Sequence, residues 1–206
     1  MADFTQSKFA IIAHQAVTNP ESIKGTAFDI RTALDCLIVC RHAYIEAVDP
    51  GGIEPEFHIM GSLDQTASPP ADSWFKIVPS FKATDPGAAP ATEAMTATEP
   101  VAETSLACAS TTGFAPGNEI YVRDTTTEAD SEWQQVDKVV TNTSIDIVEG
   151  LVTQKDSADV IWGSAQAFRI AIPGNVGHVN VYYSNEGTSA PNTAVLVEAL
   201  VNTDIE

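Results

Sequence analysis

The stretch "ALDCLIVCRHAYIEAV", residues 33–48, indicates the class of fold. Its apolar side chains occupy both sets of alternating positions, with Cys36 and Cys40 in one set and Leu37 and Val39 in the other. A strand that is apolar on both sides is covered by protein on both faces. We therefore expect this stretch to be an interior strand of an all-β protein.

Further segments with strand character lie before and after a compositionally different middle. The run "DPGG" at 49–52 predicts a turn, and strands are predicted at 56–63 and 73–83. Pro79 lacks the N–H that a ladder needs, so the second of these should be an edge strand or carry a bulge. Three longer alternating strands follow near the end of the chain, at 167–172, 178–184 and 193–201.

The middle of the chain divides into two parts. Residues 84–103 are rich in Ala, Thr, Pro and Glu without an aromatic residue, which is typical of a linker. Residues 104–163 contain short strands and Gly-, Asn- and Asp-rich turns at the spacing of a small barrel. Residues 1–83 and 164–206 are each too small to be stable alone, so we expect them to form one discontinuous, jelly-roll-like β-sandwich with the small β-barrel domain inserted.

The N-terminal segment "TQSKFAIIAHQAV", residues 5–17, allows two interpretations. A helix of about three turns would place four apolar residues on one face, namely Phe9, Ile12, Ala13 and Ala16. We favour an extended N-terminal arm.

Composition excludes several classes of partner. The 206 residues contain 10 Lys and Arg against 28 Asp and Glu, a net charge of −18, which disfavours binding to nucleic acid. The predicted insert is the more acidic part, with 14 acidic and 3 basic residues between positions 84 and 163. No apolar run reaches the length of a membrane span, and the run "FAIIA" is too short for a secretory leader, so we expect synthesis in a cytoplasm.

Three cysteines are too few for a disulfide scaffold, and we expect buried thiols at Cys36, Cys40 and Cys108. Cys36 and Cys40 would lie about 13 Å apart along a strand, beyond disulfide reach. His42 shares their face, but ligands spread along an extended chain do not converge on zinc.

No catalytic constellation, phosphate-binding loop or dinucleotide motif is present, so we expect neither an enzyme nor a cofactor.

The loop "RDTTTEADSEW" offers a weak calcium candidate in Asp124, Glu128, Asp130 and Glu132; the alternative is a solvated acidic hairpin tip. We expect the three tryptophans, Trp74, Trp133 and Trp162, to lie at strand ends and to anchor the edge of the core. A carbohydrate-binding platform would require them to be exposed and close together.

The turn "TTGFAPGNE" has a geometric explanation. Gly117 with Asn118 permits the positive φ of a tight turn, and Phe114 can close the end of a small barrel. The segment from Thr104 to Gly163 resembles a module that recurs in structural proteins of tailed bacteriophages. The turn and core residues that carry the resemblance are Leu106, Gly113, Phe114, Gly117, Asn118, Ile120, Val122, Val136, Val139, Val140, Ile145, Ile147, Leu151 and Val160.

The resemblance implies a virion structural protein, most simply a capsid decoration or cement protein. Its expected partners are copies of itself, as a trimer, and a major capsid protein or other virion protein. Alternatives are a neck, tail-tube or fibre-adaptor component, or a carbohydrate-binding receptor-recognition module.

Overall fold

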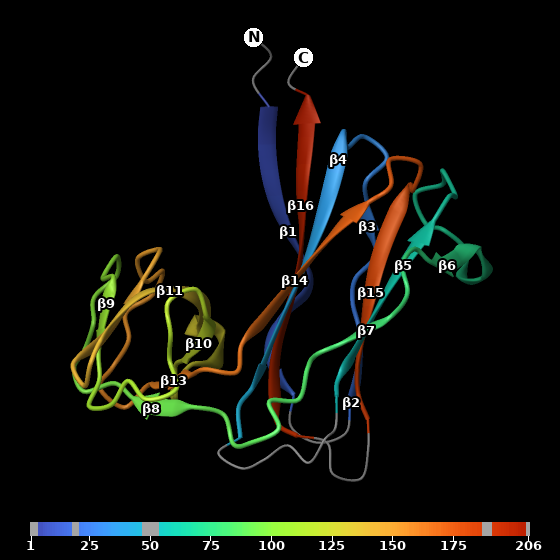
Figure 1. Cartoon of the computed structure of the whole chain (residues 1–206). Helices are drawn as coiled ribbons and strands as arrows, with labels where there is room; N and C mark the ends of the chain where they lie inside the picture. Colours follow the sequence, from blue (N-terminus) through green and yellow to red (C-terminus); the bar gives the residue numbers. More distant parts are fainter. Residues whose placement is uncertain (1–3, 18–20, 47–53, 187–190, 205–206) are drawn as a thin grey trace.

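The computed structural model describes residues 4–17, 21–46, 54–186 and 191–204, almost entirely as antiparallel strands and loops (Figure 1). The predicted all-β, sandwich-like fold is confirmed, while the turn predicted at 49–52 lies outside the described residues. The strands are β1 Phe4–Val17, β2 Glu21–Lys24, β3 Phe28–Asp29, β4 Asp35–Tyr44, β5 Glu56–Ser62, β6 Trp74–Lys76, β7 Phe81–Lys82, β8 Thr92–Ala94, β9 Ser105–Ala107, β10 Glu119–Arg123, β11 Glu132–Val140, β12 Ser144–Ile147, β13 Val160–Trp162, β14 Gln166–Ile172, β15 His178–Asn185 and β16 Thr193–Asp204. Two 3₁₀ turns, η1 Ala71–Ser73 and η2 Glu128–Asp130, complete the described elements.

Two sheets form a sandwich from sequence segments on both sides of the middle. Sheet A has the order β1-β16-β4-β14, and sheet B has the order β2-β15-β5-β6, with β3 also on β15 and β7 also on β5. In β4 the alternate residues Cys36, Ile38 and Cys40 enter the core between the sheets, because successive side chains of a strand point to opposite faces. Strands β14 and β16 pair with the two edges of β4. From β15 the corresponding core residues are Val179, Val181 and Tyr183.

The N-terminal segment is extended, as predicted, but it lies within sheet A as strand β1 and not as a separate arm. It pairs with β16 from Phe4↔Asp204 to Val17↔Thr193, with two register shifts. The reason is its apolar content, because Ile11, Ile12 and Val17 are buried in the sandwich core.

The prediction for Pro79 is confirmed. The segment 73–83 is split into β6 and β7, which flank this proline and both pair with β5 near the margin of sheet B.

The middle of the chain forms a third sheet, the insert sheet, in the order β8-β13-β10-β11-β12-β9. A bridge between Met95 and Cys108 connects the ends of this order, so the sheet curls towards a small barrel around its own core. The predicted linker at 84–103 is wrong in its second half, because β8 pairs with β13 and Glu99 bridges to Lys155. A three-residue strand needs few apolar residues, and the residue directly after β8, Met95, is fully buried.

The cysteine prediction is confirmed, since Cys36, Cys40 and Cys108 are buried and free. Burial raises the pKa of Cys36 to about 11, helped by the charge of Asp35, so this thiol stays neutral.

Among the described residues, no helix is both long enough and apolar enough to cross a membrane.

Candidate functional site at the junction of sandwich and insert

The predicted calcium loop is held by the protein's own groups. The Asp124 carboxylate accepts hydrogen bonds from the backbone N–H groups of Thr126 (2.8 Å) and Thr127 (2.7 Å) and from the Thr126 hydroxyl (2.7 Å), which closes a local turn. The carboxylates of Glu128 and Glu132 each bond to a different partner. Within the described ranges, no three His, Cys, Asp or Glu side chains are grouped closely enough to hold a metal ion.

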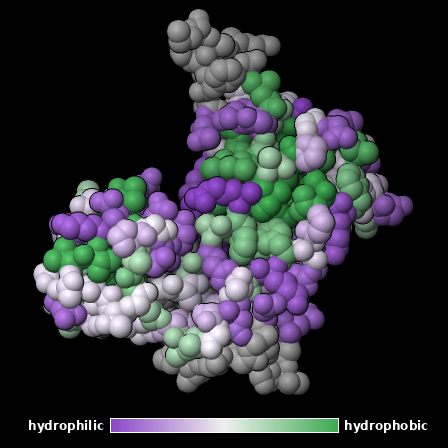
Figure 2. All heavy atoms as spheres, viewed as in Figure 1, coloured by the Kyte–Doolittle hydropathy of each residue, from purple (hydrophilic) through white to green (hydrophobic). Residues whose placement is uncertain are grey.

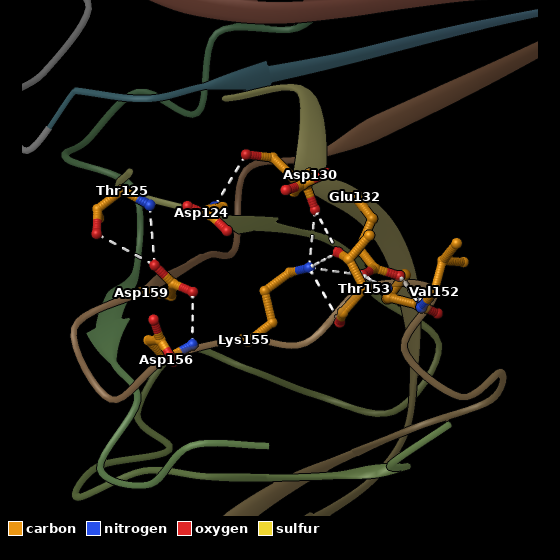
Figure 3. Close-up of polar contacts among 11 residues, drawn as sticks. Asp124, Thr125, Asp130, Glu132, Val152, Thr153, Lys155, Asp156 and Asp159 are labelled. Atoms are coloured by element: carbon orange, nitrogen blue, oxygen red, sulfur yellow. Dashed lines mark hydrogen bonds and ion pairs between the residues drawn. The ribbon is translucent and has the colours of Figure 1, made fainter. Parts of the chain in front are cut away.

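A buried lysine supplies one positive charge at this loop (Figure 3). Lys155 has no exposed side-chain surface, and its Nζ donates to Glu132 Oε1 at 2.8 Å and to the Asp130 carbonyl at 2.8 Å. It also donates to the hydroxyl and carbonyl oxygens of Thr153. An ammonium group with several oxygen acceptors is compensated in charge and in hydrogen bonds, as a buried charge requires.

Glu132 is the centre of the same network. Its Oε2 accepts from Gln134 Nε2 at 2.7 Å and from the Val152 N–H at 3.0 Å. Burial raises the pKa of Glu132, but the hydrogen bond from Lys155 and those from Val152 and Gln134 outweigh burial, so the pKa lies below its usual value. Glu132 is therefore ionised opposite Lys155 at neutral pH.

Asp159 fixes the other side of the loop. Its carboxylate accepts from the Thr125 N–H at 2.8 Å and from the Asp156 N–H at 2.8 Å (Figure 3). Together with the Lys155 network, these bonds join the segment after β10 to the segment before β13. The predicted acidic hairpin tip is thus an ordered, cross-linked loop.

A second polar cluster joins this loop to the sandwich. Tyr121 of β10 is fully buried, and its hydroxyl donates to Glu128, whose other carboxylate oxygen accepts from Arg123 Nε at 2.9 Å. His14 of β1 reaches across, with its Nε2 2.7 Å from the Tyr121 hydroxyl oxygen and 3.6 Å from Glu128 Oε1.

The environment of Glu128 favours its ionised form. Burial raises its pKa, but His14 Nε2 at 3.6 Å and the hydrogen bonds from Tyr121 and Arg123 outweigh burial and lower the pKa from 4.5 to about 2. The buried Tyr121 hydroxyl has a raised pKa, because burial and the Glu128 carboxylate both oppose its ionisation. At neutral pH the cluster therefore holds a carboxylate beside a neutral phenol.

Below these polar groups, aromatic side chains of the insert sheet pack on small side chains of sheet A. Register pairs Tyr121 with Trp162, so both project from the face opposite the insert core. They pack in one cluster with the fully buried Ala43 of β4 and Ala194 of β16. Small residues let the two sheets approach closely, which fixes the insert against the sandwich.

A polar groove runs along this junction, between the outer surface of sheet A and the insert. Arg41 and Lys8 both bind Glu198, at 2.5 and 2.7 Å, on the sandwich side. Arg169 of β14 lies 3.8 Å from Glu119 of the insert, so basic groups of the sandwich face acidic groups of the insert. Figure 2 shows hydrophilic side chains on the insert and on the part of the sandwich beside it.

The turn and core residues named from the sequence occupy the insert. Gly113 and Gly117 have positive φ values of 89° and 84°, whereas Asn118 is not among the described residues with positive φ. Its side-chain Oδ1 instead accepts from the Ala115 N–H at 3.0 Å. The apolar members Leu106, Phe114, Ile120 and Val122 are buried in the insert core.

The three tryptophans do not form one platform. Trp133 and Trp162 belong to the junction cluster, while Trp74 lies on β6 of sheet B. His42 is fully buried on β4, where it packs against Tyr44 and Tyr183.

Sequence reasoning missed His14 and Tyr121, which organise the junction, and Lys155, which organises the loop beside it. Only Lys155 had a usable signal, because it is one of three basic residues between positions 84 and 163 and follows a run of carboxylates. His14 and Tyr121 are 107 positions apart in the sequence, so no local sequence pattern predicts their contact.

Comparisons with known proteins give no family. No protein-family model matches the chain, and no curated protein matches it. Among solved structures, VP17, a capsid protein of bacteriophage P23-77, aligns over 97% of this chain and 96% of its own at 9% identity and a TM-score of 0.18. The VP2 subviral particle of infectious bursal disease virus aligns over 99% of this chain and 43% of its own, at 9% identity and a TM-score of 0.23. The VP16–VP17 complex of P23-77, a complex of two major capsid proteins, gives 11% identity over 98% of this chain and 100% of its own, with a TM-score of 0.18. These neighbours are viral capsid proteins.

Proposed function

We propose that this chain is a structural protein of a tailed-phage virion, and specifically a capsid decoration or cement protein. The observation that carries the proposal is the fixed junction between the sandwich and the insert. The buried aromatic side chains Tyr121 and Trp162 pack on Ala43 and Ala194, and the His14, Tyr121 and Glu128 cluster closes the same boundary. A protein that occupies many identical positions on a shell must present one defined surface at each of them.

The module resemblance and the charge support the same proposal. The residues of the phage-type module include the buried core of the insert, so its sequence pattern specifies a shape rather than a reaction. The net charge of −18 suits contact with basic surfaces of a neighbouring shell protein. The proposed partners are therefore copies of this chain, as a trimer, and a major capsid protein; the proposed location is the virion.

Light scattering combined with gel filtration tests the self-association. A trimer of the 21.9 kDa chain has a mass of 3 × 21.9 = 65.7 kDa. Mass spectrometry of gradient-purified virions from the source culture then tests location. A monomer that is absent from particles would overturn the proposal.

Copy number separates the variants of the proposal. A decoration protein should be present in numbers comparable to the major capsid protein, whereas a neck, tail-tube or fibre-adaptor component should be present in a few copies or in the tail alone. Detached tails that contain all of the chain would replace the decoration role by the tail role.

A further inference from the structure

The outer face of sheet B carries a second surface feature, away from the junction. Because Val179, Val181 and Tyr183 of β15 point into the sandwich core, the alternate residues Asn180 and Tyr182 project outwards. Register places Tyr182 beside Lys24 of β2, and Asn180 beside Met60 of β5.

These residues form the floor of a cavity of about 490 Å³. One wall is the segment that begins at Lys24, and the opposite wall is the loop from Pro69 to Trp74 that contains η1. This size lies within the range of small-molecule sites in proteins, about 300–1,000 Å³. The lining combines two aromatic side chains, Trp74 and Tyr182, with the apolar side chain of Met60.

Two polar groups are directed to this cavity. Asn180 is only 3% exposed, and its Oδ1 accepts from the Val181 N–H at 2.8 Å, which fixes the amide group. Its Nδ2 donors make no hydrogen bond to any residue within the described ranges, so they are available to a ligand. Lys24 places its Nζ 5.7 Å from the centre of the Tyr182 ring and is exposed.

The charge of the lining is unusual for this chain. Of the described residues that line the cavity, Lys24 alone carries a charge, although the whole chain has 28 acidic and 10 basic residues. The one charge in the lining is therefore positive, and it offers a local partner for an anionic group although the summed field of the chain is negative.

We propose that this cavity binds a saccharide that carries a carboxylate, such as a uronic acid. The C–H face of a pyranose ring packs on Trp74 or Tyr182, its hydroxyl groups accept from Asn180 Nδ2, and its carboxylate pairs with Lys24. An extended peptide is a poorer fit, because both edges of β15 are already paired and offer no ladder for strand addition.

Titration calorimetry with D-glucuronate and D-glucose, followed by a glycan array, tests the proposal on the full chain. We expect saturable binding of glucuronate at least ten-fold tighter than that of glucose. Lys24→Glu should abolish this preference without loss of folding, because the side chain is exposed. Trp74→Ala should weaken both sugars at least ten-fold, and Trp74→Phe should retain binding if the alanine variant does not fold.

Two matched controls make the test specific. Phe75→Ala changes the neighbouring aromatic residue, which is 40% exposed and does not line the cavity, and Lys138→Glu changes an exposed lysine of the insert sheet. Neither should alter sugar binding. Absence of saturable binding to every sugar tested, equal losses in the Trp74 and Phe75 variants, or equal competition by polyglutamate would overturn the proposal. None of these outcomes depends on whether the chain belongs to a virion.

Discussion

At the scale of single residues, a buried lysine lies where the sequence offered only a weak candidate for a calcium site. Of the four carboxylates within nine positions, Glu132 is bonded to the Lys155 ammonium group and Glu128 to Arg123. A cluster of carboxylates is visible in a short stretch of sequence, but its positively charged partner is not. Lys155 lies 23 positions after Glu132, in a separate segment.

Removal of this lysine should be costly. Lys155→Met leaves Glu132 buried without its counter-charge, so we expect a loss of about 3–5 kcal/mol in the free energy of unfolding, measured by urea denaturation at pH 7. The double variant with Glu132→Leu should recover part of that loss, because no unpaired charge remains. Lys138→Met, at an exposed position, should change stability by less than about 0.5 kcal/mol. A Lys155→Met variant as stable as the Lys138→Met control would show that the network contributes nothing.

The carboxylate of Glu128 predicts a pH dependence. Its pKa is lowered from 4.5 to about 2 in the folded chain, so its contribution to stability is complete above pH 4.5 and is lost as the pH falls towards 2. Glu128→Gln should therefore be less stable than the wild type at pH 6, and the difference in melting temperature should shrink between pH 4.5 and 2. Asp137→Asn, at an exposed position of β11, should follow the wild-type curve. A difference for Glu128→Gln that is the same at pH 6 and pH 3 would contradict this account.

At the scale of elements, strands with strong periodicity were predictable, whereas the short strand β8 was not. The two-sided apolar pattern of β4 and the alternation of β15 follow from burial on a pleated surface, which is a local property of the sequence. Strand β8 has only three residues, and its pairing with β13 depends on a contact 66 or more positions away. Its Ala- and Thr-rich neighbourhood therefore looked like a linker.

The turn before β10 offers a matched pair of glycines. Both Gly113 and Gly117 have positive φ, so replacement by alanine costs about 1–2 kcal/mol at either position. A Cβ at Gly117 meets nothing within 4 Å, but one at Gly113 would lie 2.7 Å from the Ala91 Cβ. Gly113→Ala should therefore cost about 1–3 kcal/mol more than Gly117→Ala in urea denaturation. Equal costs would mean that the turn and the segment at Ala91 are not packed together.

At the scale of the whole molecule, the sequence predicted which parts of the chain come together but not how they meet. The pairing of β4 with β14 and β16 across the middle follows from the need of each half for partners. The junction instead depends on surface shape, with Tyr121 and Trp162 of the insert sheet seated on Ala43 and Ala194. The sequence around Ala43 and Ala194 does not indicate that aromatic side chains of another sheet pack on these two residues.

Enlargement of one of these alanines should separate the two parts. Ala43→Leu inserts three carbon atoms beneath Tyr121 and Trp162, which costs about 1–3 kcal/mol and is relieved if the insert moves off sheet A. We expect the wild type to unfold in a single calorimetric transition and Ala43→Leu to unfold in two, and we expect limited proteolysis between the sandwich and the insert to be faster in the variant. The matched control is Ala171→Leu, the same substitution at an exposed position of sheet A, which should change neither measurement. If Ala43→Leu unfolds in one transition at the wild-type temperature, the junction does not couple the sandwich to the insert, and the fixed surface on which the proposed function rests is lost.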